Sequence, residues 1–385
     1  MQHRLIHRKS LLDEVSTRVG ESPVTVLLGA RQVGKTTLAR MLVKQRSDVT
    51  WYDLETTAGL ESLRAMPEKT LGALRGLVVI DEAQRMPDLF RILRPLCDRP
   101  TSPARFLLLG SASPDLIRGV SESLAGRVQF IDVPGLSLDD VGPDNQDRLW
   151  WRGGFPPAYM ASDHQAAHRW IEGFVQTFLE RDIPQMGIRV PASALRRFWL
   201  MAAHYHGQTL NLAELGRSMD VSPGTARHYL DILCGAFVMR QLPPWYENLG
   251  KRQVKSPKLY LRDSGLLHFF LGLDNPTALL AHPKLGASWE GFALGQMLTR
   301  LGERNAYFWG TQRGAELDLL VADGSSRIGF EFKASEAPRL TPSMRIALDD
   351  LKLDHLWVLH PGEANYALHE KVTACPLWEW ASAEA

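Results

Sequence analysis

The chain has 385 residues, of which 45% are hydrophobic and 23% charged, and its formal net charge is +1. This length predicts two or three globular domains, and the balanced charge argues against a protein that binds polyanions over its whole surface, although a local basic patch fits it. The cysteines, Cys97, Cys234 and Cys375, form no CxxC pair and no zinc-type cluster, which indicates reduced thiols. No segment resembles a signal peptide or a run of ~18 apolar residues. We therefore expect a cytoplasmic protein with no membrane partner.

An amphipathic helix is expected over residues 1–20, and the first third of the chain then alternates short apolar runs with helical patterns. The apolar runs are Val24–Leu28, Leu77–Ile80 and Phe106–Leu109. This alternation is typical of a parallel sheet with helices on both faces. We assign this α/β domain to residues 1–145, and we interpret the polar stretch Asp139–Asp147 as a linker.

Residues 29–36, GARQVGKT, match the pattern GxxxxGK[ST] and lie between an expected strand and an expected helix. In such a P-loop the backbone N–H groups turn inward as an anion nest at a helix N-terminus. Lys35 can reach the β- and γ-phosphates of ATP, and Thr36 can bind Mg²⁺. The residues expected to hold the nucleotide are Gly29, Ala30, Arg31, Gln32, Val33, Gly34, Lys35, Thr36 and Thr37.

The strand expected at residues 77–80 ends in two carboxylates, Asp81 and Glu82. A buried parallel strand brings both residues to the carboxyl edge of the sheet, next to the P-loop. There Asp81 would hold Mg²⁺, and Glu82 would orient or polarise the attacking water. The pair favours ATP hydrolysis over simple nucleotide storage.

Two further residues are candidates for contact with the γ-phosphate. Ser111 follows the third apolar run, where a polar sensor is expected, and Ser113 is the alternative; a serine in an ordinary turn explains either one equally well. Arg127 is a candidate arginine finger or sensor, because arginine stabilises charge on the transferred phosphoryl group. An ordinary surface arginine is the alternative.

Residues 146–260 are predicted to be helical, and the part from residue 210 has the order of a winged helix. There a helix is followed by a turn, a second helix begins at Pro223 with Ser222 as its N-cap, and a short strand comes next. The segment 191–260 holds nine Lys or Arg and four acidic residues, a net charge of +5. That charge suits contact with the phosphate backbone of DNA or RNA. A structural module is the alternative interpretation.

Residues 261–385 are predicted to form a mixed α/β domain. A strand at 255–261 precedes it, and we expect a helix at 289–300 followed by strands at 306–309, 316–321, 328–333 and 354–359. Glu316 and Asp318 share one face of their strand, and Glu331 and Lys333 share one face of theirs. The Asp323-Gly324 turn joins these two strands. Asp318, Glu331 and Lys333 are therefore expected to converge.

This convergence is the Asp…(Asp/Glu)-x-Lys pattern of restriction-endonuclease-like nucleases. In that chemistry two carboxylates hold Mg²⁺ and the lysine stabilises or activates the hydrolytic water. The sequence thus predicts Asp318, Glu331 and Lys333 as catalytic residues. Asp318 and Glu331 would bind the metal, with Glu290 on the preceding helix as a third acid. An amphipathic hairpin with a solvated face is the alternative.

Several segments together resemble a known family, the bacterial and archaeal ATPases that join an N-terminal AAA+-type domain to a C-terminal nuclease-like (PD-(D/E)xK-type) domain of unknown function. The segments are GARQVGKTTLAR, LVVIDEAQ, LLLGSAS, SLAGRV, FLERDIPQ, KLYLRDSGLLHFFLGL, WEGFALGQML and GAELDLLVADGSSRIGFEFKAS. The resemblance implies ATP and Mg²⁺ at the N-terminal motifs and a nuclease-like site at Asp318, Glu331 and Lys333. It implies no settled substrate for the C-terminal domain.

Two functional hypotheses follow from the sequence. The first is a Mg²⁺-dependent ATPase that acts as a motor or switch on DNA or RNA, with metal-dependent cleavage by its C-terminal domain. The second is an ATP-dependent regulatory switch whose C-terminal domain is a non-catalytic module for binding protein or nucleic acid. A homo-oligomer fits either hypothesis, and the sequence does not identify the physiological partner.

Overall fold

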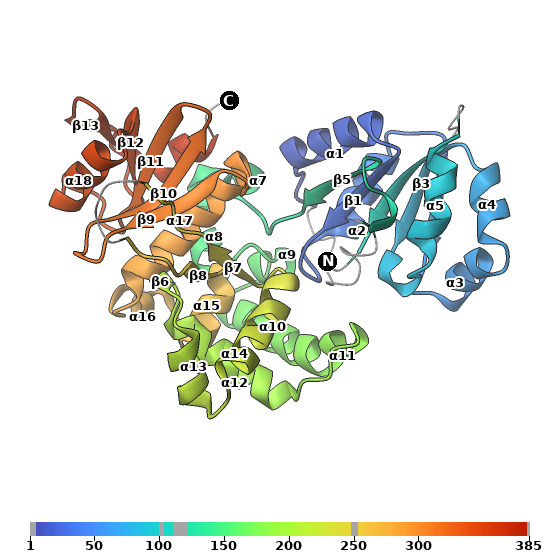
Figure 1. Cartoon of the computed structure of the whole chain (residues 1–385), viewed down its shortest axis with the longest axis horizontal. Coiled ribbons are helices and arrows are strands. Elements are labelled where there is room, and N and C mark those ends of the chain that lie inside the picture. The colour runs from blue at the N-terminus through green and yellow to red at the C-terminus, as the bar shows by residue number, and fades with distance from the viewer. Residues whose placement is uncertain (1–4, 100–103, 111–119, 121, 248–252, 383–385) are drawn as a thin grey trace. The chain divides into compact units, whose positions relative to one another are not determined.

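The computed structural model describes residues 5–99, 104–110, 120, 122–247 and 253–382. The chain divides into two compact units, and Figure 1 colours it in chain order. The first unit comprises residues 1–135 and 235–237, and the second comprises residues 136–234 and 238–385. Among the residues described, no helix is long and apolar enough to cross a membrane.

The first unit is built on a sheet of five parallel strands in the order β2-β3-β4-β1-β5. The strands are β1 (Val24–Leu28), β2 (Val49–Asp53), β3 (Gly76–Asp81), β4 (Ala104–Leu109) and β5 (Val128–Asp132). All of β1 and nearly all of β3 are buried, which is why both consist mainly of apolar residues without alternation. The predicted parallel sheet is confirmed.

Helices cover this sheet. They are α1 (Lys9–Glu21), α2 (Lys35–Val43), α3 (Thr57–Arg64), α4 (Pro67–Ala73), the short η1 (Ala83–Arg85) and α5 (Leu89–Cys97). Side chains of α3, α4 and α5 pack with Val24, Val26 and Leu28 into one hydrophobic core. Helices α1 and α2 contact each other, and α1 also contacts β1 and β4. The expected N-terminal helix begins at Lys9 among the residues described.

The second unit begins with helices. They are α7 (Leu138–Val141), η2 (Pro143–Asn145), α8 (Gln146–Arg152), α9 (Pro156–Tyr159), α10 (His164–Thr177), η3 (Phe178–Asp182) and α11 (Ile183–Gln185). The predicted linker at Asp139–Asp147 is wrong, because these residues form α7, η2 and the start of α8. A capping box in which Ser137 and Asp140 exchange hydrogen bonds opens α7. The acidic residues that suggested a linker thus stabilise a helix N-terminus.

Three helices and a small antiparallel sheet follow. They are α12 (Ala192–His204), α13 (Leu212–Met219) and α14 (Pro223–Gly235), with the strands β6 (Gln208–Thr209), β7 (Met239–Leu242) and β8 (Lys258–Leu261) in the order β6-β8-β7. The Ser222 hydroxyl accepts a hydrogen bond from the Thr225 N–H at 3.0 Å, as expected for an N-cap. Strand β8 is the shorter, observed form of the strand expected at 255–261.

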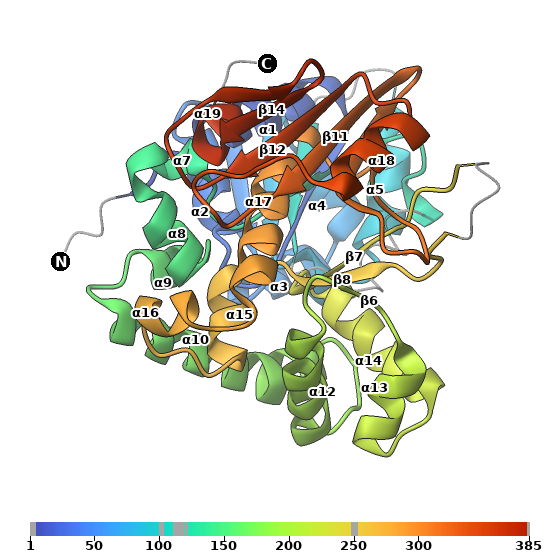
Figure 2. The ribbon, with the colours of Figure 1, turned by 90° about the vertical axis from the view of Figure 1, so that its left-hand side faces the viewer.

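The C-terminal part is a mixed sheet of six strands in the order β13-β14-β12-β11-β10-β9, and Figure 2 shows β14, β12 and β11 in that order. The strands are β9 (Ala306–Gly310), β10 (Glu316–Asp323), β11 (Ser326–Phe332), β12 (His355–His360), β13 (Tyr366–His369) and β14 (Val372–Pro376). The helices of this part are α15 (Ser264–Phe270), α16 (Pro276–Leu280), α17 (Leu285–Leu301), α18 (Pro342–Asp350) and α19 (Leu377–Ser382). The four strands expected from sequence are confirmed as β9 to β12, whereas β13 and β14 were missed. Helix α17 contacts β11, and α18 contacts β10 and β12.

Candidate functional site

The loop between β1 and α2 has the backbone that the glycine pattern predicts. Gly34, immediately before α2, has a φ of 102°, which favours glycine. A Cβ atom on Gly29 would lie 2.5 Å from the Val133 carbonyl oxygen, so only glycine fits there. Gln32 also has a positive φ, 61°. The loop therefore closes tightly over the first turn of α2, where anions bind.

The Lys35 side chain is held inside this loop. Its Nζ donates hydrogen bonds to the carbonyl oxygens of Gly29 and Ala30, at 2.9 and 2.8 Å. Burial lowers the pKa of Lys35 to about 8, and the nearby Glu82 and Asp81 carboxylates oppose that shift. A buried ammonium group that is hydrogen-bonded to two loop carbonyls is well suited to pair with phosphate oxygens.

Thr36 and Asp81 meet at the carboxyl edge of the sheet. The Thr36 hydroxyl donates a hydrogen bond to Asp81 Oδ2 at 2.9 Å. Burial raises the pKa of Asp81, and the Thr36 hydrogen bond opposes that rise. A hydroxyl and a carboxylate side by side, next to the buried Lys35, are the oxygen ligands that suit Mg²⁺ bound with a nucleotide. These residues therefore fit the predicted cofactors.

Glu82 follows Asp81 in a strained backbone conformation, with a φ of 56°. Its N–H donates to Asp81 Oδ1 at 3.0 Å, and its side chain accepts a hydrogen bond from Gln84. A non-glycine residue in the left-handed region costs roughly 1–3 kcal/mol, and such strain clusters at functional sites. Glu82 is half-buried at the same sheet edge as Asp81, where the sequence predicted it.

The remaining predicted nucleotide contacts differ in their outcomes. Val33 is buried within the loop, Arg31 is half-buried and Thr37 is exposed on α2. Ser111 and its alternative Ser113 lie outside the described residues, which reach Gly110 at this point.

Arg127 lies away from the P-loop. It immediately precedes Val128, which pairs with Val24 at the start of β1, whereas the P-loop follows the end of β1. The separation is one strand length, on the order of 15 Å. Its guanidinium instead forms two hydrogen bonds with the Asp98 carboxylate, at 2.5 and 3.1 Å. The structure thus does not bring Arg127 to the nucleotide site of its own chain.

The C-terminal strands bring Asp318, Glu331 and Lys333 together. Leu319 pairs with Phe330, so Asp318 and Glu331 are opposite each other one residue further along β10 and β11. Asp318 Oδ2 accepts a hydrogen bond from the Phe332 N–H at 3.0 Å, and Lys333 Nζ donates to Glu331 Oε2 at 2.6 Å. The carboxylates of Asp318 and Glu331 are buried, at 7% and 4% exposure.

Two residues of β8 that were not predicted complete this cluster. Lys258 Nζ lies 2.9 Å from Glu290 Oε1 and 3.5 Å from Asp318 Oδ1, and it also contacts the Glu316 carboxylate. The Tyr260 hydroxyl donates to Glu290 Oε1 at 2.5 Å. The signal for both residues was the alternation in Lys258-Leu259-Tyr260-Leu261, which puts two polar side chains on one face of a buried strand.

The cluster carries more acidic than basic groups. Burial raises the pKa of Glu331 to about 8 and of Glu290 to about 7, and in both cases the charge of Asp318 adds to the rise. The attraction of Glu331 for Lys333 opposes the first shift, and that of Lys258 for Glu290 opposes the second. Burial is thus the larger cause of both rises in pKa, and repulsion by the Asp318 carboxylate is the second.

The carboxylates of this cluster are not arranged as a metal site. Within the described ranges, no group of three or more His, Cys, Asp or Glu side chains could hold a metal ion. Lys258 takes the place between Glu290 and Asp318 that a cation would need. The predicted metal role of Glu290, Asp318 and Glu331 thus does not fit, because an internal ammonium already lies within 3.5 Å of two of the three carboxylates.

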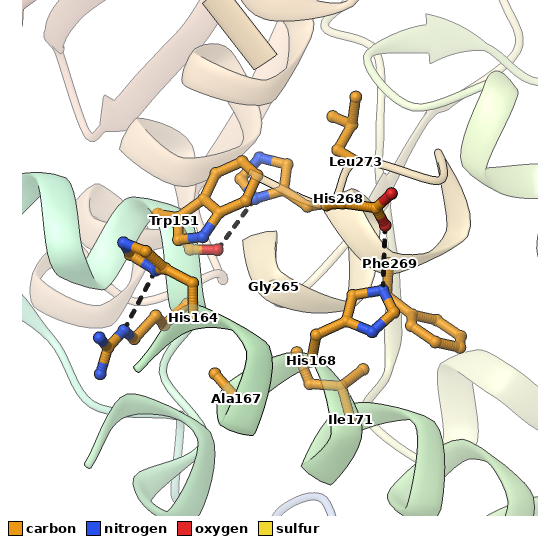
Figure 3. A pocket seen from close by; sticks show the side chains of 11 residues that line it. Trp151, His164, Ala167, His168, Ile171, Gly265, His268, Phe269 and Leu273 are labelled. Carbon is orange, nitrogen blue, oxygen red and sulfur yellow. Dashed lines mark hydrogen bonds and ion pairs between the residues drawn. The ribbon is translucent and has the colours of Figure 1, made fainter. Parts of the chain in front are cut away.

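A small cavity lies within the second unit, between α8, α10 and α15 (Figure 3). Its volume of about 20 Å³ holds roughly one water molecule. His268 in its wall is hydrogen-bonded through both ring nitrogens, to the Trp151 carbonyl at 3.0 Å and to the Ser288 hydroxyl at 2.7 Å. Burial lowers the pKa of His268 to about 4. These contacts indicate a neutral, structural histidine and not a ligand site.

Comparisons with known families match three consecutive segments of the chain to three different domain families. Residues 21–141 match an AAA domain, residues 143–277 match a domain of unknown function (DUF8612), and residues 285–380 match another (DUF4143). The AAA match covers the P-loop and the Asp81-Glu82 pair. This part of the chain is therefore an AAA-type P-loop domain.

Two curated proteins are similar over nearly the whole chain. They are the uncharacterized proteins Rv2008c of Mycobacterium tuberculosis and Mb2031c of Mycobacterium bovis, each 50% identical over 372 residues, which is 97% of this chain and 84% of the relative. Among solved structures, the Walker-type ATPase PABY2304 of Pyrococcus abyssi matches with a TM-score of 0.52 at 15% identity, covering 70% of this chain and 97% of that one. The structural match shows a shared fold.

Proposed function

This chain belongs to the family represented by the mycobacterial proteins Rv2008c and Mb2031c, and on that premise we propose that its AAA domain hydrolyses ATP in a Mg²⁺-dependent reaction. The observation that carries the proposal is the joint placement of Lys35, Thr36 and Asp81. The ammonium group lies inside the loop, and the hydroxyl and carboxylate touch each other at its mouth.

Each residue of the nucleotide site has a role that follows from its position. The loop from Gly29 to Thr37 binds the triphosphate through its N–H groups, and Lys35 exchanges its two carbonyl partners for phosphate oxygens. Thr36 and Asp81 would hold Mg²⁺, which neutralises charge on the phosphates when bound. Glu82 polarises the attacking water, because its half-buried carboxylate follows Asp81 at the same sheet edge.

Hydrolysis is tested directly by the release of phosphate from ATP. The purified full-length chain should release phosphate when Mg²⁺ is present and stop when EDTA removes it, because the phosphate charges are then unscreened. Phosphate release is followed by a colorimetric assay, with ADP production by chromatography as a second measurement. Tight ATP binding without any release would reduce the proposal to nucleotide binding alone.

Arg127 retains one proposed role. Its side chain is 31% exposed and pairs with Asp98 at the surface of the first unit. In a homo-oligomer this surface could supply the arginine to the nucleotide of a neighbouring subunit, which is how an arginine finger acts in trans. The proposed role of Arg127 therefore depends on self-association of the chain, and no other proposed role does.

For the C-terminal domain we favour the second sequence-based hypothesis, a non-catalytic binding module. The arrangement of Asp318, Glu331 and Lys333 on adjacent strands supports the nuclease-like resemblance in shape. The contacts of Lys258 with Glu290 and Asp318 argue against metal-dependent cleavage. The proposed whole is an ATP-driven switch that couples the AAA domain to this module.

Contact with DNA or RNA is proposed for the winged-helix-like region α12–α14, on the observation that it presents exposed arginines. They are Arg196, Arg197, Arg217 and Arg227. Not every basic residue counted in the sequence is available, because Lys258 is buried and Arg240 pairs with Glu303 at 2.9 Å. The basic surface is thus smaller than the composition of 191–260 suggested.

Binding through these arginines should weaken steeply as salt rises. Reversing Arg196 and Arg227 to Glu should lower the slope of log K against log salt by roughly two, because two phosphate contacts are lost. Fluorescence anisotropy with labelled DNA and RNA measures this. Reversal of Arg339 and Arg345, which are exposed outside the region, changes the net charge equally and should leave the slope unchanged. Equal effects of both pairs would contradict a contact at α12–α14.

A further inference from the structure

Strand β8 belongs to the small antiparallel sheet, yet its Lys258 side chain ends among carboxylates of the C-terminal domain. The residue is 2% exposed, and its Nζ contacts Glu290 on α17 together with Glu316 and Asp318 on β10. The carboxylates that surround the Lys258 ammonium belong neither to neighbouring residues in the sequence nor to the small sheet. The lysine therefore links two parts of the second unit through charge.

The ammonium group of Lys258 is held as a metal ion would be. Its three carboxylate partners come from two separate elements, α17 and β10, and the Phe308 ring lies 5.7 Å from Nζ. Burying an unpaired ammonium is strongly unfavourable, so these partners are required for Lys258 to stay inside. In the same way the carboxylates of Glu290 and Asp318, which are largely buried, require the positive charge.

One oxygen of each predicted metal-binding carboxylate also accepts a hydrogen bond within the protein. Glu290 Oε1 accepts from both Lys258 and Tyr260, at 2.9 and 2.5 Å. Asp318 Oδ2 accepts from the Phe332 N–H, and Glu331 Oε2 accepts from Lys333. Each carboxylate that the sequence offered as a metal ligand thus has a donor within the protein.

We propose that Lys258 occupies the cation position of this cluster and closes it to divalent metals, so that the Glu290–Asp318–Glu331 group is an internal ion-pair network and not a metal site. The network ties β8 to α17 and β10 without any cofactor. This inference does not depend on ATP hydrolysis in the first unit. It gives a physical reason for a C-terminal domain with a nuclease-like arrangement of side chains that does not use Mg²⁺.

The proposal is tested by Mn²⁺ binding to the full-length, nucleotide-free chain, measured by the electron paramagnetic resonance signal of unbound Mn²⁺. The wild type should leave the Mn²⁺ signal unchanged. Lys258→Met keeps the length of the side chain and removes its charge, so one Mn²⁺ per chain should bind, at least about tenfold more tightly than to the wild type. Adding Asp318→Asn to this variant should abolish the gain, because the site loses a carboxylate.

Two controls test whether Mn²⁺ binding requires the loss of positive charge at position 258. Lys255→Met removes an exposed lysine three residues earlier and should bind no Mn²⁺. Lys258→Arg keeps the positive charge and should also bind none. A gain of binding in either control, or no gain in a folded Lys258→Met variant, would overturn the assignment of the cation position.

The wild-type result decides the question even if Lys258→Met does not fold. Wild-type binding of one Mn²⁺ that Asp318→Asn abolishes would mean that the carboxylates hold metal with Lys258 present, and the proposal would be wrong. Wild-type binding that is absent, or that Asp318→Asn leaves unchanged, supports it, because any remaining Mn²⁺ then lies elsewhere.

Discussion

Replacing Lys35 with alanine is expected to abolish the stabilisation that Mg²⁺-ATP gives to the chain, and to lower ATP hydrolysis at least about 100-fold. At a nucleotide concentration of 100 times Kd, the wild type should gain about 2.7 kcal/mol in its free energy of unfolding, since ATP binds only the folded state. In the variant the loop keeps its backbone, but the ammonium group that lies inside it is gone. The affinity for the triphosphate should fall with it.

Thermal melting with and without Mg²⁺-ATP measures this effect. In the wild type, the nucleotide should raise the melting temperature of the transition that it shifts by roughly 5–10 °C. Lys44→Ala is the matched control, because Lys44 is exposed at the opposite end of the same helix. It should melt and hydrolyse ATP as the wild type does. A wild type whose melting ignores Mg²⁺-ATP would contradict the interpretation of the loop as a nucleotide site.

The N-terminal fold could be predicted because its signals are local. The apolar runs that become β1, β3 and β4 are each continuous in sequence, and a strand that is buried on both faces needs no alternation. The loop between Gly29 and Lys35 carries its own geometry in two glycines, one of which has a φ of 102° at Gly34. Strand, loop and helix can therefore be predicted from the consecutive residues 24–43.

The C-terminal cluster could be predicted only in part, because its composition depends on contacts between distant segments. Asp318, Glu331 and Lys333 lie on two strands joined by a short turn, so their convergence follows from register. Lys258 is 32 residues from Glu290 in sequence. The alternation in β8 marks Lys258 as a polar residue on one face of a buried strand, but it does not show which carboxylates the side chain meets. That contact changes the chemistry from a metal site to an ion-pair network.

Arg127 is a residue whose type suggested a role that its position in the fold does not allow within the same chain. The residue type suits a phosphoryl group, but its place in the chain, immediately before β5, puts it at the amino edge of a parallel sheet. All five strands of that sheet run in the same direction, so the nucleotide edge is fixed as soon as the strand boundaries are known. The sequence did not reveal β5 as a strand, and without β5 the edge on which Arg127 lies could not be decided.

Glu82→Gln is expected to keep ATP binding and to lose turnover by roughly 10²–10⁴-fold, the range over which a general base contributes. Glutamine has the size of glutamate, and the backbone strain at a φ of 56° is the same for both residues. The amide oxygen can still accept the hydrogen bond from Gln84. The substitution thus removes the negative charge next to Asp81 and leaves the local structure intact.

The measurement pairs two experiments on the same protein. Isothermal titration with Mg²⁺-ATP should give an affinity close to that of the wild type, while phosphate release should be nearly absent. Glu61→Gln, at an exposed position on α3, is the control for the loss of one carboxylate from this unit and should change neither quantity. A parallel loss of affinity and turnover in Glu82→Gln would make Glu82 a structural residue. The role of activating water would then have to pass to another acceptor at the same edge of the sheet.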